Sequence, residues 1–151
     1  MAKLRKGDKA PDFNLMDQNS KFTALASFGG SRLLVYFYPE ADTPGCTRQA
    51  QSVQAAMPDL SDIDIKCVGI SPDSVESQKR FAEKYKLNFP LLSDYDHKAA
   101  NAYGTWDDQK GGIIRSSFLI DENGMIVDAQ YNVKPEDTVP KAKDALQVAG
   151  K

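Results

Sequence analysis

The pattern of apolar and polar residues predicts a buried strand that leads directly into a helix. Residues 32–38 form an almost continuous apolar and aromatic run, with Gly-Gly-Ser before it and Pro39 after it, which is typical of a central strand. After a loop that contains proline and glycine, apolar residues recur at spacings of three and four from Cys46 to Met57. This spacing predicts a helix that carries Cys46 in its first turn and ends near Pro58.

Strands and helices continue to alternate along the chain. Residues 63–70 are predicted to form the next strand, and a helix capped by Asp73 or Ser74 follows it. This order implies parallel strands joined by right-handed crossovers. The other predicted elements are an N-terminal hairpin (12–16 and 21–23), a helical turn (24–28), a short strand near an edge (88–93), a short helix (96–103), a strand (113–120), a turn (121–124), a returning strand (125–131) and a closing helix (about 135–148).

Composition and charge narrow the class of protein. With 151 residues, 41% of them hydrophobic and 26% charged, the chain is predicted to be one soluble globular domain, residues 1–151. The net charge of -2 and the scattered lysines argue against nucleic acid as a partner. The charged first residues contain no apolar stretch suited to a signal peptide or a membrane span, so no membrane is expected and a cytoplasmic location is the default. Two cysteines and one histidine are too few for an ordinary structural zinc site, and neither a metal nor another cofactor is expected.

Cys46 is the residue that most clearly suggests chemistry. The thiolate is the nucleophilic form of cysteine, and a helix N-terminus stabilises negative charge through its unpaired N–H groups and its dipole. Thr43 lies three residues earlier, where its hydroxyl can donate to the thiolate or bind an incoming oxygen. The alternative is that Cys46 is only a small buried apolar residue, since free cysteine is among the most buried residue types.

The segment Pro39-Glu-Ala-Asp-Thr43-Pro-Gly-Cys46 resembles the active-site signature Pro-x-x-x-Thr-x-x-Cys of the peroxiredoxins. The longer run around it is similar to the bacterioferritin-comigratory, or Q-type, branch of that family. Four further segments resemble the same branch in the same order, so the resemblance covers most of the chain. These segments are residues 10–13, 69–74, 89–94 and 114–121.

The order of the predicted elements is that of a thioredoxin-like α/β sandwich, with a mixed central sheet, helices on both faces and an N-terminal β-hairpin. The resemblance implies a thiol-dependent peroxidase, in which the Cys46 thiolate attacks hydrogen peroxide or an organic hydroperoxide and becomes a sulfenic acid. The matching catalytic positions are Pro39, Thr43, Cys46 and Arg115. Arg115 matches the family arginine that contacts the thiolate, and a guanidinium suits the charge that develops on the oxygens. The alternative is an edge-strand arginine that faces water.

Two positions depart from the Q-type pattern. Gln51 stands where many members of that branch have a resolving cysteine, and Gln49 stands where a glutamate is often found. Cys67 is the only other thiol, and its apolar surroundings predict a packed place in a central strand, with a Cys46–Cys67 disulfide as the alternative. The chain is therefore predicted to use one cysteine and an external thiol as reductant, such as a thioredoxin, a glutaredoxin or a small thiol. We expect a monomer or a homodimer.

Two other classes of function use the same cysteine. A thiol–disulfide oxidoreductase is disfavoured because Cys46-Thr-Arg-Gln lacks the second cysteine of a Cys-x-x-Cys pair. A non-catalytic redox sensor or interaction module would report the oxidation of Cys46 to a partner. Three residues are predicted to lie outside the chemistry: His97 and Arg48 as solvated surface residues, and Trp106 as packing in the core or a loop.

Overall fold

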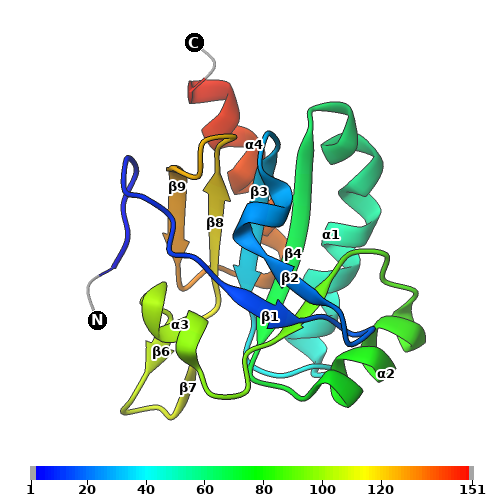
Figure 1. The fold of residues 1–151 in the computed structure, drawn as a ribbon. Helices are drawn as coiled ribbons and strands as arrows, with labels where there is room; N and C mark the ends of the chain where they lie inside the picture. The colour runs from blue at the N-terminus through cyan, green and yellow to red at the C-terminus, as the bar shows by residue number, and fades with distance from the viewer. Residues whose placement is uncertain (1–2, 150–151) are drawn as a thin grey trace.

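The computed structural model describes residues 3–149, and within this range a seven-stranded sheet carries helices on both faces (Figure 1). Its strands are β1 (Asn14–Met16), β2 (Phe22–Ala24), β3 (Arg32–Phe37), β4 (Ile65–Ser71), β5 (Leu91–Ser93), β8 (Ser116–Ile120) and β9 (Ile126–Tyr131). The helices are α1 (Pro44–Asp62), α2 (Val75–Tyr85), α3 (Lys98–Ala102) and α4 (Thr138–Ala149), with 3-10 turns η1 (Leu25–Phe28) and η2 (Pro135–Asp137). A separate ribbon pairs β6 (Trp106–Asp107) with β7 (Gly112–Ile113).

The strands of the large sheet lie in the order β2-β1-β5-β4-β3-β8-β9. β3, β4 and β5 are parallel because α1 and α2 cross over between them, whereas β8 and β9 pair antiparallel beside β3. β1 and β2 form the predicted N-terminal hairpin at the far edge, and β1 pairs with β5. The mixed sheet and its hairpin confirm the predicted thioredoxin-like fold class.

Strand β3 is buried on both of its faces, which explains its continuous apolar sequence. Successive side chains of a strand point in opposite directions. Leu34 and Tyr36 pack with α1, α2 and α4, whereas Leu33 and Val35 pack with α3 and the N-terminal segment. The sheet thus has a hydrophobic core on each face, and Cys46 belongs to the core that contains Leu34 and Tyr36.

Helix α1 continues past Pro58 to Asp62, so the predicted end near Pro58 is wrong. A proline inside a helix removes one hydrogen bond and costs about 3 kcal/mol. The additional turn places Leu60 in the core, where it is 1% exposed. Burying a leucine side chain contributes about 1.5–3 kcal/mol. Tertiary packing therefore offsets the local preference for ending the helix.

The strand predicted at 113–120 is divided in the structure. Ile113 belongs to β7 of the small ribbon, whereas β8 begins only at Ser116. Two-residue strands carry no readable periodicity, so the sequence does not separate β7 from β8. Arg115 therefore lies in the connection before β8, and the prediction that it stands within a strand is wrong.

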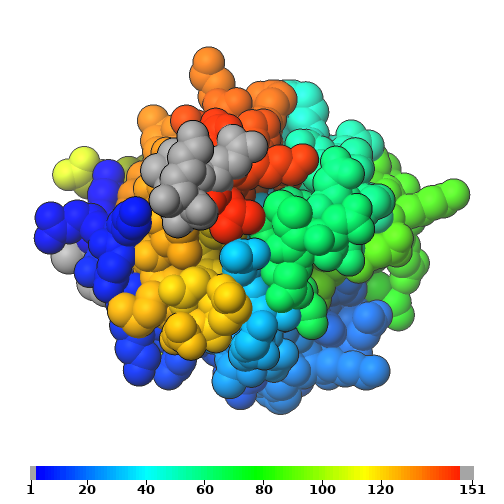
Figure 2. Space-filling view, turned by 90° about the horizontal axis from the view of Figure 1, so that it is seen from above, coloured from blue at the N-terminus to red at the C-terminus, as the bar shows by residue number. Residues whose placement is uncertain are grey.

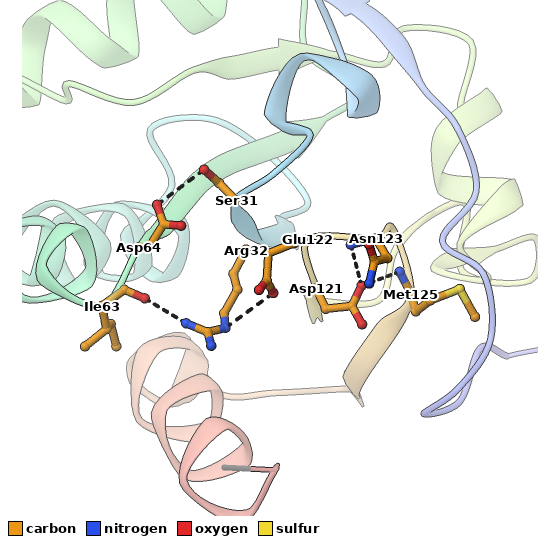
Figure 3. A network of polar contacts seen from close by, with 8 residues as sticks. All are labelled: Ser31, Arg32, Ile63, Asp64, Asp121, Glu122, Asn123 and Met125. Atoms are coloured by element: carbon orange, nitrogen blue, oxygen red, sulfur yellow. Dashed lines mark hydrogen bonds and ion pairs between the residues drawn. The ribbon is translucent and has the colours of Figure 1, made fainter.

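The end of the sheet where β3 begins is closed by polar contacts (Figure 3). Arg32 donates from Nη1 to the Ile63 carbonyl (3.0 Å) and pairs through Nε with Glu122 (3.7 Å). The Asp121 carboxylate accepts a hydrogen bond from the Met125 N–H (3.0 Å), within the predicted turn between β8 and β9. Figure 2 shows the C-terminal part of α4, in red, beside the end of α1, in green, and the β8–β9 turn, in yellow. Because β3 runs away from this end, the loop to α1 leaves the sheet at the opposite end (Figure 1).

Candidate active site at the end of the central strand

Cys46 lies in the first turn of α1, as predicted, at the corner where the chain leaves the central strand. Pro44 begins the helix, and proline suits this position because its φ is already helical and its missing N–H would have no partner there. The Thr47 N–H donates to the Thr43 carbonyl (2.8 Å) as the helix starts. Cys46 is only 1% exposed. The sulfur is therefore held in the core at the positive end of the helix dipole.

Arg115 approaches this sulfur from the connection that leads into the neighbouring strand β8. β8 pairs antiparallel with β3 so that Ser116 lies opposite Phe37, and the residue before β8 therefore meets the chain that leaves β3. Arg115 Nη2 donates to the Cys46 Sγ at 3.5 Å. A Cβ atom at Gly45 would lie 3.0 Å from Nη2, so the glycine leaves room for the guanidinium. Arg115 is half-buried here and does not simply face water.

The other side of the guanidinium is held by Gln49. Arg115 Nη1 donates to Gln49 Oε1 (2.6 Å), and Gln49 Nε2 donates to the Thr138 hydroxyl oxygen (2.8 Å). Gln49 lies one turn after Cys46 on α1, and Thr138 is the first residue of α4; both side chains are fully buried. The sequence marked Gln49 only as a departure from the family pattern. Thr138 belongs to no motif and lies 89 positions away, so sequence reasoning missed it.

The Thr43 hydroxyl does not donate to the Cys46 sulfur, which is one of the two roles that the sequence suggests for it. It donates instead to the Glu40 carbonyl (2.8 Å). This bond gives a partner to a backbone carbonyl in the tight loop before α1, and such groups are rarely left unpaired. The hydroxyl oxygen keeps its lone pairs, so it can still accept a hydrogen bond from a molecule bound beside the sulfur.

Further hydrogen bonds tie the loop between β3 and α1 to helix α2 and to the loop before α2. Asp42 has a positive φ of 62° and accepts a hydrogen bond from Lys84 Nζ on α2 (2.9 Å). The Ala41 N–H donates to the Asp73 carboxylate (2.7 Å). Pro39 is half-buried at the start of the loop and has no N–H to compete for these acceptors. The loop that carries Thr43 is thus held at two neighbouring residues.

Cys67 lies in β4, in the core that also contains Cys46, and is 5% exposed. Burial raises the pKa of the Cys67 thiol to about 12, so this thiol is neutral at neutral pH. Both cysteines are free in the structure. The packed position of Cys67 agrees with the predicted place in a central strand.

Cys67 is expected to resist alkylation in the native protein. A rise in its pKa from 9.0 to about 12 makes the thiolate about 1000-fold rarer at neutral pH, since three pH units separate the two values. In the Cys46→Ser variant, iodoacetamide labelling followed by mass spectrometry should be very slow in buffer and fast in denaturant. Rapid labelling of the folded variant would show that Cys67 is accessible and reactive.

The other polar residues singled out in the sequence lie apart from this site. Arg48 is an exposed charge on α1, as predicted, and its hydrogen bond holds the pKa of the Glu136 carboxyl below its usual range. His97 is not fully solvated: its ring stacks on Trp106 at 3.7 Å between centroids. Among residues 3–149, no three His, Cys, Asp or Glu side chains are grouped so as to hold a metal ion. In the same range, no helix has the length and hydrophobicity that crossing a membrane requires.

The fold and the cysteine at the start of α1 define the class of thioredoxin-like proteins with a thiol at this corner. Residues 6–129 match the AhpC/TSA family, and the chain belongs to this family. A putative peroxiredoxin of Mycobacterium tuberculosis (strain H37Rv) is 43% identical over 97% of this chain and 97% of its own. A cysteine-to-serine mutant of Xylella fastidiosa peroxiredoxin Q superimposes with a TM-score of 0.91 at 28% identity, over 100% of both chains. The Xanthomonas campestris bacterioferritin comigratory protein gives 0.85 at 32% identity, over 92% of both chains.

These similarities confirm the predicted family and its Q-type branch. The protein is a peroxiredoxin, a thiol-dependent peroxidase that takes a peroxide as substrate and a thiol as reductant. The alternatives of a thiol–disulfide oxidoreductase and a non-catalytic sensor are therefore disfavoured.

Proposed function

We propose that Cys46 is the residue that attacks the peroxide. The observation that supports this assignment is the position of the Arg115 guanidinium, 3.5 Å from the Cys46 sulfur at the N-terminus of α1. A permanent positive charge and a helix N-terminus both favour the thiolate over the thiol. Cys67 has neither neighbour and is held as a neutral thiol by burial.

In the proposed reaction, the Cys46 thiolate attacks one peroxide oxygen in line with the O–O bond. A sulfur–oxygen bond forms and the O–O bond breaks. The second oxygen leaves with the electron pair and takes a proton from solvent, giving water or an alcohol. The sulfur is oxidised by two electrons to a sulfenic acid, and the peroxide is reduced by the same two electrons.

The surrounding residues have separate roles in this proposal. Arg115 stabilises the charge on the thiolate and on the oxygens as the O–O bond breaks. The Thr43 oxygen accepts a hydrogen bond from the hydroperoxide O–H, because its own hydrogen is used on the Glu40 carbonyl. Pro39 covers one side of the site without adding a competing donor.

We propose hydrogen peroxide and organic hydroperoxides as substrates. Both contain the O–O bond and the O–H group that this arrangement addresses. The alkyl peroxide reduction activity attributed to the similar Xanthomonas campestris protein supports the organic class.

The oxidised enzyme is proposed to be reset by an external thiol in a one-cysteine cycle. Gln51, exposed on α1, offers no sulfur, and Cys67 is neutral and packed in β4. A first thiol condenses with the sulfenic acid, releasing water and forming a mixed disulfide. A second thiol then displaces Cys46 and leaves with the first as a disulfide. Thioredoxin, glutaredoxin or a small thiol can supply both equivalents.

The cellular compartment, the domain organisation and the oligomeric state of the protein are part of the same proposal. A reducing compartment such as the cytoplasm would supply the thiols that the cycle consumes and would keep Cys46 and Cys67 free. We propose that residues 1–151 act as one domain, since one seven-stranded sheet contains both β1 near the start of the chain and β9 near its end. The working form is proposed to be a monomer or a homodimer.

The reset of Cys46 can be tested by following its oxidation products. After one equivalent of hydrogen peroxide, a sulfenic-acid reagent such as dimedone is expected to label Cys46, as read by mass spectrometry, because no second thiol lies ready to react. The Cys67→Ser variant is expected to turn over at the parent rate with an external thiol. An intramolecular Cys46–Cys67 disulfide in quantitative yield, with turnover lost in Cys67→Ser, would instead make Cys67 the resolving residue.

A further inference from the structure

We propose that Gln49 and Thr138 are positioning residues that hold the guanidinium of Arg115 toward Cys46 while leaving its positive charge unneutralised. The inference rests on the proposed roles of Cys46 and Arg115 and explains how this chain supports them. Neither Gln49 nor Thr138 is proposed to touch the peroxide.

The three side chains form one continuous relay from the sulfur to α4. Arg115 donates from Nη2 to the Cys46 Sγ (3.5 Å) and from Nη1 to Gln49 Oε1 (2.6 Å). Gln49 Nε2 then donates to the Thr138 hydroxyl oxygen (2.8 Å). Nη1 and Nη2 therefore each have one hydrogen-bond partner. The two hydrogen bonds together fix the plane of the guanidinium.

Arg115, which can only donate, selects the orientation of the Gln49 amide, and the Thr138 hydroxyl accepts from the amide NH2 group in that orientation. An amide turned the other way would point its NH2 group at the guanidinium, donor against donor. Gln49 and Thr138 are both 0% exposed, so water does not replace a lost partner, and an unpaired buried group is costly. The hydroxyl on α4 thus anchors the amide by giving its buried NH2 group a partner while the amide oxygen faces Arg115.

The amide holds Arg115 without cancelling its charge. A carboxylate at 2.6 Å would form an ion pair with the guanidinium and compete with the thiolate for it. Arg115 takes part in no ion pair within the described residues. Glu136, the acidic residue of η2 that packs near the start of α1, is paired with Arg48 at 2.9 Å. The thiolate is therefore the anion that Arg115 faces.

Three buried titratable groups around this contact stay neutral near neutral pH. Burial raises the pKa of Tyr36 and Tyr38 on β3 far above that range and raises the pKa of Cys67 on β4 to about 12. The charged residues on the nearby part of α1, around η2 and on α4 are Arg48, Lys134, Glu136, Asp137, Lys141, Lys143 and Asp144. A change in the pH profile of Cys46 alkylation is therefore not caused by these three buried groups.

The first test is the Gln49→Glu variant in a Cys67→Ser background, with the parent Gln49 in the same background as control. The rate of Cys46 alkylation by iodoacetamide, followed against pH, should show its midpoint shifted upward by about one pH unit, because a new negative charge opposes the thiolate. The plateau rate at high pH should stay near that of the parent, because a carboxylate still accepts from Arg115. An unshifted midpoint overturns the inference.

The second test compares Thr138→Val with Thr138→Ser. Valine keeps the volume of threonine but removes the acceptor, so the amide is released and kcat/KM for hydrogen peroxide should fall by about 10- to 100-fold. Serine retains the hydroxyl and should restore the parent value. Equal rates in the two variants would show that Thr138 only packs. If Thr138→Val does not fold, the pH profile of Cys46 alkylation in the Gln49→Glu variant is by itself the test of the relay.

Failure of this inference can be told apart from failure of the proposed function. Alkylation of Cys46 does not require peroxidase activity. A Cys46→Ser variant that still consumes peroxide overturns the proposed function, whereas matching alkylation profiles with glutamine and glutamate at position 49 overturn the relay.

Discussion

Replacing Cys46 by serine is expected to abolish peroxide consumption and to leave the fold intact. Serine differs by a single atom and its hydroxyl can accept the hydrogen bond that Arg115 now donates to the sulfur. Its hydroxyl is not ionised at neutral pH and cannot follow the sulfenic acid chemistry that a thiolate performs. The measurement is the loss of hydrogen peroxide over time at substoichiometric protein, with an excess of a thiol reductant.

The matched control is Cys67→Ser. This variant lacks the second of the two thiols and should retain turnover. Circular dichroism and thermal unfolding of both variants show whether the fold is preserved. Because the assay requires many turnovers per protein molecule, it also separates a peroxidase from a sensor that reacts once. Undiminished turnover by Cys46→Ser would end the assignment of Cys46.

The Arg115→Ala variant is expected to react with peroxide about 100–1000-fold more slowly, which is the usual effect of removing one preorganised donor from a developing negative charge. Nη2 is the donor within 3.5 Å of the sulfur, and alanine removes both the donor and the charge. Stopped-flow measurement of the second-order rate with hydrogen peroxide, repeated across pH, tests this expectation.

Arg80→Ala is the matched control, because Arg80 is an exposed arginine on α2 that donates to Ser77 and not to the site. Its rate should equal that of the parent. Arg115→Ala also leaves the buried Gln49 oxygen without its donor, so a stability loss of about 1–3 kcal/mol is expected. The rates should therefore be compared well below the unfolding temperature. A rate equal to the parent at every pH would reduce Arg115 to a structural role.

The effects expected for Cys46→Ser and Arg115→Ala both arise at a site where three parts of the fold meet. The start of α1 supplies Cys46 and Gln49, the connection before β8 supplies Arg115, and the start of α4 supplies Thr138. The C-terminal helix is therefore linked to the reactive sulfur through hydrogen bonds and not only through apolar packing. Under our proposal, substitutions at the start of α4 alter peroxide reactivity without touching the substrate.

Features that depend on neighbours along the chain could be predicted from the sequence. The continuous apolar run of β3, the proline and glycine before Cys46, and the spacing of three and four after it placed Cys46 in the first turn of α1. The spacing between Thr43 and Cys46 is equally local, so the sequence also predicts that Thr43 lies near Cys46. The parallel crossovers, the N-terminal hairpin and the β8–β9 turn followed from the same kind of pattern, whereas the order of the strands in the sheet did not.

Some local expectations failed because packing outweighs propensity. Pro58 favours an end of α1, but the burial of Leu60 carries the helix on to Asp62. No periodicity marks where the ribbon of β6 and β7 ends and β8 begins.

The sequence by itself determined the fold class, the corner that holds Cys46 and the absence of a thiol at Gln51, because each depends on residues close together along the chain. The Arg115 contact was implied by the family resemblance and not by any pattern in the chain, and only the tertiary structure decided how Arg115 is held beside the sulfur. Arg115 reaches Cys46 across 69 positions and Gln49 reaches Thr138 across 89. Contacts at such separations depend on the antiparallel register of β8 against β3 and on the packing of α4 against α1. Hydrogen bonds between single side chains leave no periodic signal in the sequence, so their partners become known only when the sheet and helices are assembled.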